Sequence, residues 1–386
     1  MCSTASVASE NFPAFSSAIT LATVPLLMPS LAALLGQGEV YQLHPLTTSP
    51  KRVANFASGE TVRNEYSSVI YFINQVRARE VAMGIKLYKE PRLQKPVLVV
   101  GWPGIGNVGL IAVVTLRAQI EAEEFGEIEP HDFFYPTRVV IKADLLAELE
   151  FPTSRFYYKR LDGKDLIIFI GEEQPTDGQG AYAQGRKAYQ MANLVLDVAE
   201  RFGCRRVYTS GAAVALVHHT TRPRVWAVPN KKELLAEVRR YDNTVLMSEI
   251  EGRGGQGSIT GLNGLLLGVA KKRGIEGICL MGEIPDYLSG APFPYPKASK
   301  SVLEVMSSIL GISLDLTSLD DMEARVVELV ESIYEKFPAE IKERLEQRKL
   351  VTPTGPGAIT EEDQKWIKEH IDDFFKKGPE ADERPL

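Results

Sequence analysis

The chain has 386 residues, a formal net charge of −6 and an average globular composition, with 44% hydrophobic and 24% charged residues. This length allows one large or two ordinary domains, and the acidic balance argues against a nucleic-acid partner. The three cysteines, Cys2, Cys204 and Cys279, are scattered and form no CxxC pair. We therefore expect no disulfide framework and no metal site, and we place the protein in the reducing cytoplasm.

The N-terminal residues 1–82 differ from the rest of the chain. Residues 1–50 contain no Lys or Arg, and prolines interrupt the apolar run of residues 18–35. A secretory signal needs a basic start, and the prolines and polar flanks argue against a membrane span. Residues 79–82 can be encoded by a purine-rich sequence typical of a ribosome-binding site. Our hypothesis is that residues 1–82 are an over-extended reading frame and that the native protein begins at Met83.

The first strong pattern is PVLVVGWPGIGNVGLIAVV, residues 96–114. Residues 97–100 predict a strand that is buried on both faces, followed by a Gly/Pro loop and by an apolar helix that begins near Val108. Glycines let a ligand approach the backbone, and a helix N-terminus favours negative charge, so this unit is a potential anion site. The candidate ligand-binding residues in it are Gly101, Gly104, Gly106 and Asn107.

The same loop satisfies the dinucleotide pattern GxGxxG from Gly104 to Gly109. However, Trp102 and Pro103 stand where a pyrophosphate would need open backbone. The acidic residue expected about 20 positions later could come only from residues 121–124, which we interpret as a solvated helix end. We therefore expect no NAD, no NADP and no other cofactor. The simpler alternative is that the glycines pack the helix closely against the sheet.

Farther along the chain, apolar strands alternate with amphipathic helices. Asp162-Gly163 predicts the turn of a hairpin between residues 155–160 and 166–170. We expect further strands at 206–209, 225–228, 244–250 and 277–281, and helices at 181–202, 231–240, 262–272, 297–310 and 320–350. This order predicts an α/β three-layer sandwich with a mixed, mainly parallel sheet. The expected domain spans 83–350, followed by a linker, 351–359, and by a C-terminal helix and tail, 360–386.

Two predicted strands end alike, in Gly171-Glu172 and in Gly282-Glu283. Strand carboxyl ends form the ligand crevice of open α/β sheets, so Glu172, Glu283 and Gly211 should gather there with the first glycine loop. The two glutamates could bind a hydroxyl, an amine or a metal, or act as a paired acid and base. No nucleophile or metal set accompanies them, so we favour the alternative that each one fixes a neighbouring loop, and we assign no catalytic residue.

Three loops carry weaker signals. Residues 253–261 form a glycine loop that could bind phosphate through its N–H groups, although it lacks the Lys-Ser/Thr ending of a P-loop. The basic turn of residues 218–224, which contains His218-His219, Arg222 and Arg224, is either an anion contact or a structural or interface loop. As neighbours in a strand the two histidine rings would point to opposite faces. Tyr287, Phe293 and Tyr295 lie on a proline-rich loop that we expect to be exposed, as an interface anchor or a lid.

Several segments together resemble the PAC2 family of proteasome assembly chaperone-like proteins. They are Gly101-Trp-Pro-Gly-Ile-Gly-Asn-Val-Gly109, Asp132-Phe-Phe-Tyr-Pro136, Gly171-Glu-x-Gln-Pro175, Thr221-Arg-Pro-Arg-Val225, Gly261-Leu-Asn-Gly-Leu-Leu-Leu-Gly268, Leu280-Met-Gly-Glu-Ile-Pro285 and Tyr295-Pro-Lys297. The resemblance covers Met83 to about Leu350. It implies an α/β fold like that of purine nucleoside phosphorylases, homo-oligomers and no established catalytic residues.

The resemblance also implies a role in assembling the 20S proteasome or other complexes. Archaeal members that dock on proteasome α-rings end in a hydrophobic-Tyr-any tail, whereas this chain ends in Glu383-Arg384-Pro385-Leu386. Docking through that tail is therefore not expected. The first hypothesis is a non-catalytic, homo-oligomeric assembly chaperone or scaffold with protein clients such as proteasome subunits. The alternative is an enzyme that binds a nucleoside- or phosphate-type ligand in the crevice.

Overall fold

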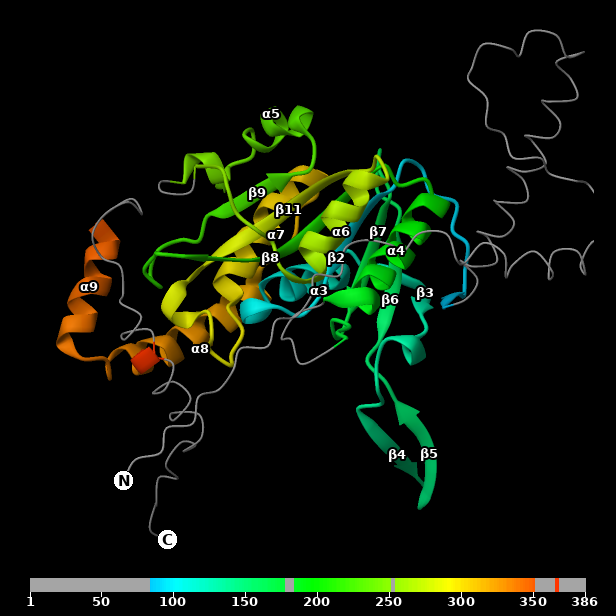
Figure 1. Cartoon of the computed structure of the whole chain (residues 1–386), viewed down its shortest axis with the longest axis horizontal. Coiled ribbons are helices and arrows are strands. Elements are labelled where there is room, and N and C mark those ends of the chain that lie inside the picture. Colours follow the sequence, from blue (N-terminus) through cyan, green and yellow to red (C-terminus); the bar gives the residue numbers. More distant parts are fainter. Residues whose placement is uncertain (1–83, 178–183, 251–253, 351–364, 368–386) are drawn as a thin grey trace, which may run out of the picture. The chain divides into compact units, whose positions relative to one another are not determined.

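The computed structural model describes residues 84–177, 184–250, 254–350 and 365–367 (Figure 1). The hypothesis about residues 1–82 and the linker predicted at 351–359 lie outside these residues, as does most of the predicted segment 360–386. All described residues belong to one compact unit of the chain, Ser68–Leu386. No helix among them is both long and apolar enough to cross a membrane.

A nine-stranded mixed sheet forms the middle layer, in the order β1-β3-β6-β7-β2-β8-β11-β9-β10. Its centre is parallel and consists of β7 (Leu166–Gly171), β2 (Val97–Gly101), β8 (Arg206–Ala215) and β11 (Glu276–Pro285). The antiparallel strands β6 (Ser154–Lys159), β3 (Glu123–Ile128) and β1 (Ile85–Leu87) extend the sheet beyond β7. Beyond β11 lie β9 (Val225–Pro229), antiparallel to it, and β10 (Thr244–Val245).

Helices cover both faces of this sheet (Figure 1). One layer contains α3 (Val108–Gln119) and α7 (Pro296–Leu310), extended by α8 (Thr317–Tyr334) and α9 (Ala339–Leu350). The other contains α4 (Gly185–Arg201) and α6 (Gly261–Lys272). In β2, Val97 and Val99 contact the first layer while Leu98 and Val100 contact the second, because successive side chains point to opposite faces.

The structure confirms the predicted three-layer α/β architecture and the hairpin between β6 and β7. The phosphorylase-like comparison is compatible with it and stays a prediction. Four local predictions are wrong. Residues 121–124 are no helix end, because β3 begins at Glu123 and pairs with β6. The helix expected at 231–240 is a 3-10 turn followed by α5 (Leu235–Val238), and the strand expected at 244–250 is only β10. The helix expected at 320–350 is interrupted near Pro338, whose missing N–H breaks helical bonding.

One two-stranded sheet stands apart from the main sheet. β4 (Arg138–Lys142) pairs with β5 (Leu145–Glu150) in an antiparallel ribbon, and neither strand joins the nine-stranded sheet. Figure 1 shows this ribbon extending away from the sheet beyond β6. Its turn residues, Ala143 and Asp144, both have positive φ, 52° and 65°. This hairpin was not among the predicted elements.

Candidate functional site

A crevice of about 230 Å³ lies where β2, β8 and β11 end, at the edge expected from the strand order. Its walls are the loop after β2, the end of β8 and the segment that leads into α6. Residues that line it include Trp102, Gly104, Gly211, Gln174, Thr260 and Asn263. Of the predicted ligand-binding residues, Gly104 and Gly211 line this crevice, whereas Gly101, Gly106, Asn107, Glu172 and Glu283 are not among its described lining. Ligand binding here stays a prediction.

The glycines of the first loop serve close packing. A Cβ atom on Gly109 would lie 2.2 Å from the backbone oxygen of Ser210, so α3 can approach β8 only with glycine at this position. The buried hydroxyl of Ser210 lies 3.2 Å from the Gly109 carbonyl oxygen and binds it. Gly106 has a φ of +57°, and a Cβ atom there would meet Tyr295 at 2.9 Å. Helix packing against the sheet was the simpler alternative for these glycines.

Gln174 connects its own loop, after β7, with the loop after β2 and with the first turn of α6. Its Nε2 donates to the backbone oxygen of Pro103 at 2.5 Å, and its Oε1 accepts from the backbone N–H of Leu262 at 2.9 Å. Leu262 lies in the first turn of α6, where backbone N–H groups have no partner within the helix. Gln174 therefore caps α6 from a distant loop. No local pattern indicates this role for Gln174, although it lies in one of the segments that resemble the PAC2 family.

The described lining of the crevice has no titratable side chain. It offers hydroxyl, amide and backbone groups, and the buried Oδ1 of Asn263 has no hydrogen-bond partner among the described residues. The described residues also contain no group of three or more His, Cys, Asp or Glu that could hold a metal ion. The crevice thus presents neutral polar contacts within an otherwise apolar wall.

Glu172 and Glu283 do not form a pair, because β2 and β8 separate the strands that carry them. Glu172 is exposed and accepts the backbone N–H of Thr153 at 2.8 Å. Glu283 is only 1% exposed and accepts from Nη2 of Arg224 at 2.7 Å and from Nε1 of Trp226 at 2.9 Å. Each glutamate therefore holds a neighbouring segment of the chain, and paired acid–base chemistry between them is excluded.

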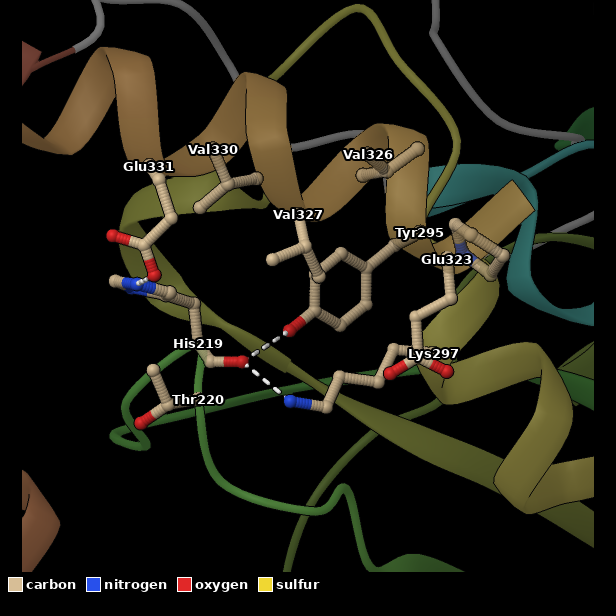
Figure 2. Close-up of a pocket in the computed structure, with 10 residues that line it drawn as sticks. His219, Thr220, Tyr295, Lys297, Glu323, Val326, Val327, Val330 and Glu331 are labelled. Atoms are coloured by element: carbon tan, nitrogen blue, oxygen red, sulfur yellow. Dashed lines mark hydrogen bonds and ion pairs between the residues drawn. The ribbon is translucent and has the colours of Figure 1, made fainter. Parts of the chain in front are cut away.

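A second cavity, of about 180 Å³, lies between α8, the start of α7 and the loop after β8 (Figure 2). Val326, Val327 and Val330 of α8 form its apolar wall. Lys297 donates from Nζ to the backbone oxygen of His219 at 2.8 Å, and the Tyr295 hydroxyl donates to the same oxygen at 3.5 Å (Figure 2). Burial lowers the pKa of Lys297. These bonds fix the loop after β8 to the first turn of α7.

The two adjacent histidines are stacked, with ring centroids 4.0 Å apart. The expectation that they point to opposite faces is wrong, because they lie in the loop between β8 and β9 and not in a strand. His219 lies 2.8 Å from the Tyr287 hydroxyl through Nδ1 and 3.1 Å from Glu331 through Nε2. Burial lowers the pKa of His218 to about 3 and also lowers that of His219. A lowered pKa favours the neutral form of both rings, which make internal contacts here. An anion contact by Arg222 and Arg224 of the same turn stays a prediction.

The aromatic loop is also less exposed than predicted. Tyr287 and Tyr295 are buried, and Phe293 is half-buried. The tyrosines are buried because the Tyr287 ring packs on His219 and Phe337 while Tyr295 lies under α8. The expectation of exposed tyrosine anchors is therefore wrong, and Phe293 as an interface residue stays a prediction.

Comparison with known families decides the relationship. The model of the PAC2 family matches residues 98–333, more than half of the chain. The chain belongs to the PAC2 family. This PAC2 protein is 30% identical over 249 residues to an uncharacterized protein of Methanocaldococcus jannaschii, a match that covers 64% of this chain and 86% of that protein.

Solved structures of related proteins share this fold. The archaeal proteasome activator PbaB of Pyrococcus furiosus superposes with a TM-score of 0.54 at 30% identity, over 64% of this chain and 97% of PbaB. A PAC2 family protein from Streptomyces avermitilis superposes with a TM-score of 0.51 at 21% identity, over 62% of this chain and 97% of that protein. At that lower identity the second likeness concerns the fold alone.

Proposed function

We propose that this PAC2 protein is a non-catalytic, homo-oligomeric assembly chaperone or scaffold whose clients are proteasome subunits. The observation that carries the proposal is the likeness to PbaB, a proteasome activator, at 30% identity over nearly the whole of PbaB. We also propose a cytoplasmic location, for which the free thiols of Cys204 and Cys279 give support.

The described sites agree with a role that depends on surfaces. The titratable side chains singled out above, Glu172, Glu283 and the two histidines, all make internal contacts. The described crevice lining contains no carboxylate, imidazole, amine or thiol, so its hydroxyl groups, on Ser258 and Thr260, have no side-chain base within that lining. No relative reported above favours the alternative of an enzyme with a nucleoside- or phosphate-type ligand.

The test is an assembly reaction with the full chain and purified proteasome α and β subunits from the same organism. We expect the protein to bind the free subunits and to increase the yield of 20S particles, measured by native electrophoresis and by peptide hydrolysis. A protein of similar size and charge without PAC2 relatives is the control. Absence of binding to either subunit would contradict the proposal.

A second arm of the same experiment separates assembly from activation. The protein is added to 20S particles that are already assembled, and peptide hydrolysis is measured again. An assembly chaperone should leave this rate unchanged. An increase only with assembled particles would replace the assembly role by one like that described for PbaB.

A further inference from the structure

The β4–β5 ribbon has one face made of aliphatic side chains. In its register Val139 lies opposite Leu149, and Ile141 lies opposite Leu146. Opposed residues and alternate residues of a strand share a face, so these four side chains form one surface, here called the aliphatic face. Their exposed fractions are 48% for Val139, 71% for Ile141, 73% for Leu146 and 52% for Leu149.

The opposite face of the ribbon carries two ion pairs, together with Val140 and the exposed Leu145, which lies opposite Lys142. Arg138 binds Glu150 across the strands at 2.5 Å, and Lys142 binds Glu148 at 2.7 Å. Both ion pairs connect β4 with β5, so the positive and negative charges of each pair cancel within the ribbon. A partner therefore needs no matching charges on this element.

The aliphatic face is not covered by the described part of the chain. The ribbon extends away from the nine-stranded sheet (Figure 1), and its strands pair only with one another among the described residues. A lone two-stranded hairpin is marginally stable in water unless an apolar face packs against something. Monomeric proteins also rarely expose a contiguous apolar patch of more than a few hundred Å². A covering partner is therefore expected.

We propose that the aliphatic face packs against the same face of a second copy of this chain. This inference rests on the homo-oligomer of the proposed function and assigns a surface to it. A face of four aliphatic side chains is complementary to itself, as a two-fold symmetric contact requires. The four side chains are about half to three-quarters exposed, so two such faces in contact bury an area that approaches the roughly 1,000 Å² at which specific interfaces begin.

The test places two charges on this face in the full chain, in the double variant Ile141→Glu with Leu146→Glu. Across a two-fold contact these carboxylates would face their own copies in a desolvated interface. We expect the wild type to be an even-numbered oligomer at micromolar concentration, and the variant to have half that mass or less, by light scattering and sedimentation. A monomeric wild type, or a folded variant with unchanged mass, overturns the proposal.

Two control variants isolate the effect of the face. Lys142→Gln with Glu148→Gln removes an ion pair from the opposite face without changing the net charge, and should keep the wild-type mass. Tyr189→Glu with Leu216→Glu adds the same two charges at exposed apolar positions outside the ribbon, and should also keep it. Loss of mass in either control contradicts a contact that is confined to the aliphatic face.

If the charged variant misfolds, disulfide cross-linking tests the same contact between two copies. Ile141→Cys should form a disulfide-linked dimer under mild oxidation, whereas Arg138→Cys on the opposite face should not. No dimer with Ile141→Cys, or equal yields from both variants, overturns the proposal.

The assembly reaction distinguishes this inference from the proposed function. If the wild type fails to assist 20S assembly but the ribbon variant still loses mass, only the proposed function fails. If the wild type assists assembly while the ribbon variant keeps its mass, only the ribbon contact fails, and a client protein becomes the expected occupant of the aliphatic face.

Discussion

The same Gly-Glu sequence, followed shortly by a proline, lies at the carboxyl ends of β7 and β11, yet the two ends have different environments. β7 stops at Gly171, so Glu172 lies outside the strand and is exposed. β11 continues to Pro285, so Glu283 lies inside a strand that pairs with β8 on one side. On the other side of β11, the backbone N–H of Glu283 donates to the carbonyl oxygen of Arg224, which lies just before β9.

The difference comes from the neighbouring strand and not from the motif itself. β9 runs antiparallel to β11 and brings Arg224 and Trp226 beside the Glu283 carboxylate. β7 also has an antiparallel neighbour at its end, because β6 begins at Ser154 opposite Gly171, and the backbone of Thr153 just before it binds Glu172 twice. Among the described residues, however, no Arg or Trp side chain of β6 binds the Glu172 carboxylate as Arg224 and Trp226 bind that of Glu283. The same Gly-Glu sequence thus carries a buried carboxylate, paired with a partly exposed arginine, in one place and a surface contact in the other.

The largest expected effect is that of Glu283→Ala. Removing the carboxylate leaves the Arg224 guanidinium and the Trp226 indole N–H without this acceptor, and loss of one partner of a buried ion pair costs about 3 kcal/mol. We expect this decrease in the free energy of unfolding, measured by urea denaturation. Glu172→Ala is the matched control, with an expected change below about 1 kcal/mol. Equal losses in the two variants would contradict the comparison.

Substitution of Gly171 and of Gly282 should lower the stability by similar amounts, unlike substitution of Glu172 and Glu283. A Cβ atom on Gly282 would lie 2.7 Å from the backbone oxygen of Ala298 in α7, and one on Gly171 would lie 2.4 Å from Nε1 of the buried Trp102. Overpacking of this kind costs about 1–3 kcal/mol, so Gly282→Ala and Gly171→Ala should each lower the free energy of unfolding by that amount.

Gly268 provides the control for these two substitutions. It lies in α6, and a Cβ atom there would have no heavy atom within 4 Å. Because alanine favours a helix interior over glycine by roughly 1 kcal/mol, Gly268→Ala should be neutral or stabilising. A loss of stability in this variant as large as in the other two would remove close packing as their cause.

The layer order could be predicted because it depends on local patterns. Residues 97–100 are continuously apolar, which is typical of a strand buried on both faces, and Asp162-Gly163 marks a hairpin. The β4–β5 hairpin was missed because Ala143 and Asp144 adopt positive φ without the glycine that normally indicates such a turn. The end of β11 and the stacked histidines depend on contacts that are distant in sequence, and no local pattern encodes them.

The last prediction concerns pH, and at neutral pH its effect on stability is the smallest of the set. The chain runs from Glu283 to Tyr287, whose hydroxyl binds His219, and His219 stacks on His218. Burial lowers the pKa of His218 from its ordinary 6.5 to about 3 and also lowers that of His219. Below pH 6.5 the unfolded chain therefore binds protons that the folded chain does not. Folding should lose up to about 1.4 kcal/mol per pH unit for each histidine as the pH falls.

The expected stability is full above pH 6.5 and decreases toward pH 5, measured as the free energy of unfolding in urea. His218→Gln removes one titrating group, so its stability should depend less steeply on pH than that of the wild type. Glu346, 3.8 Å from Nε2 of His218, and the nearby Lys349 and Arg348 act on the same ring, and the variant leaves all three in place. Equal pH dependence in the variant and the wild type would show that His218 is not the group responsible, because every other charge around it is unchanged.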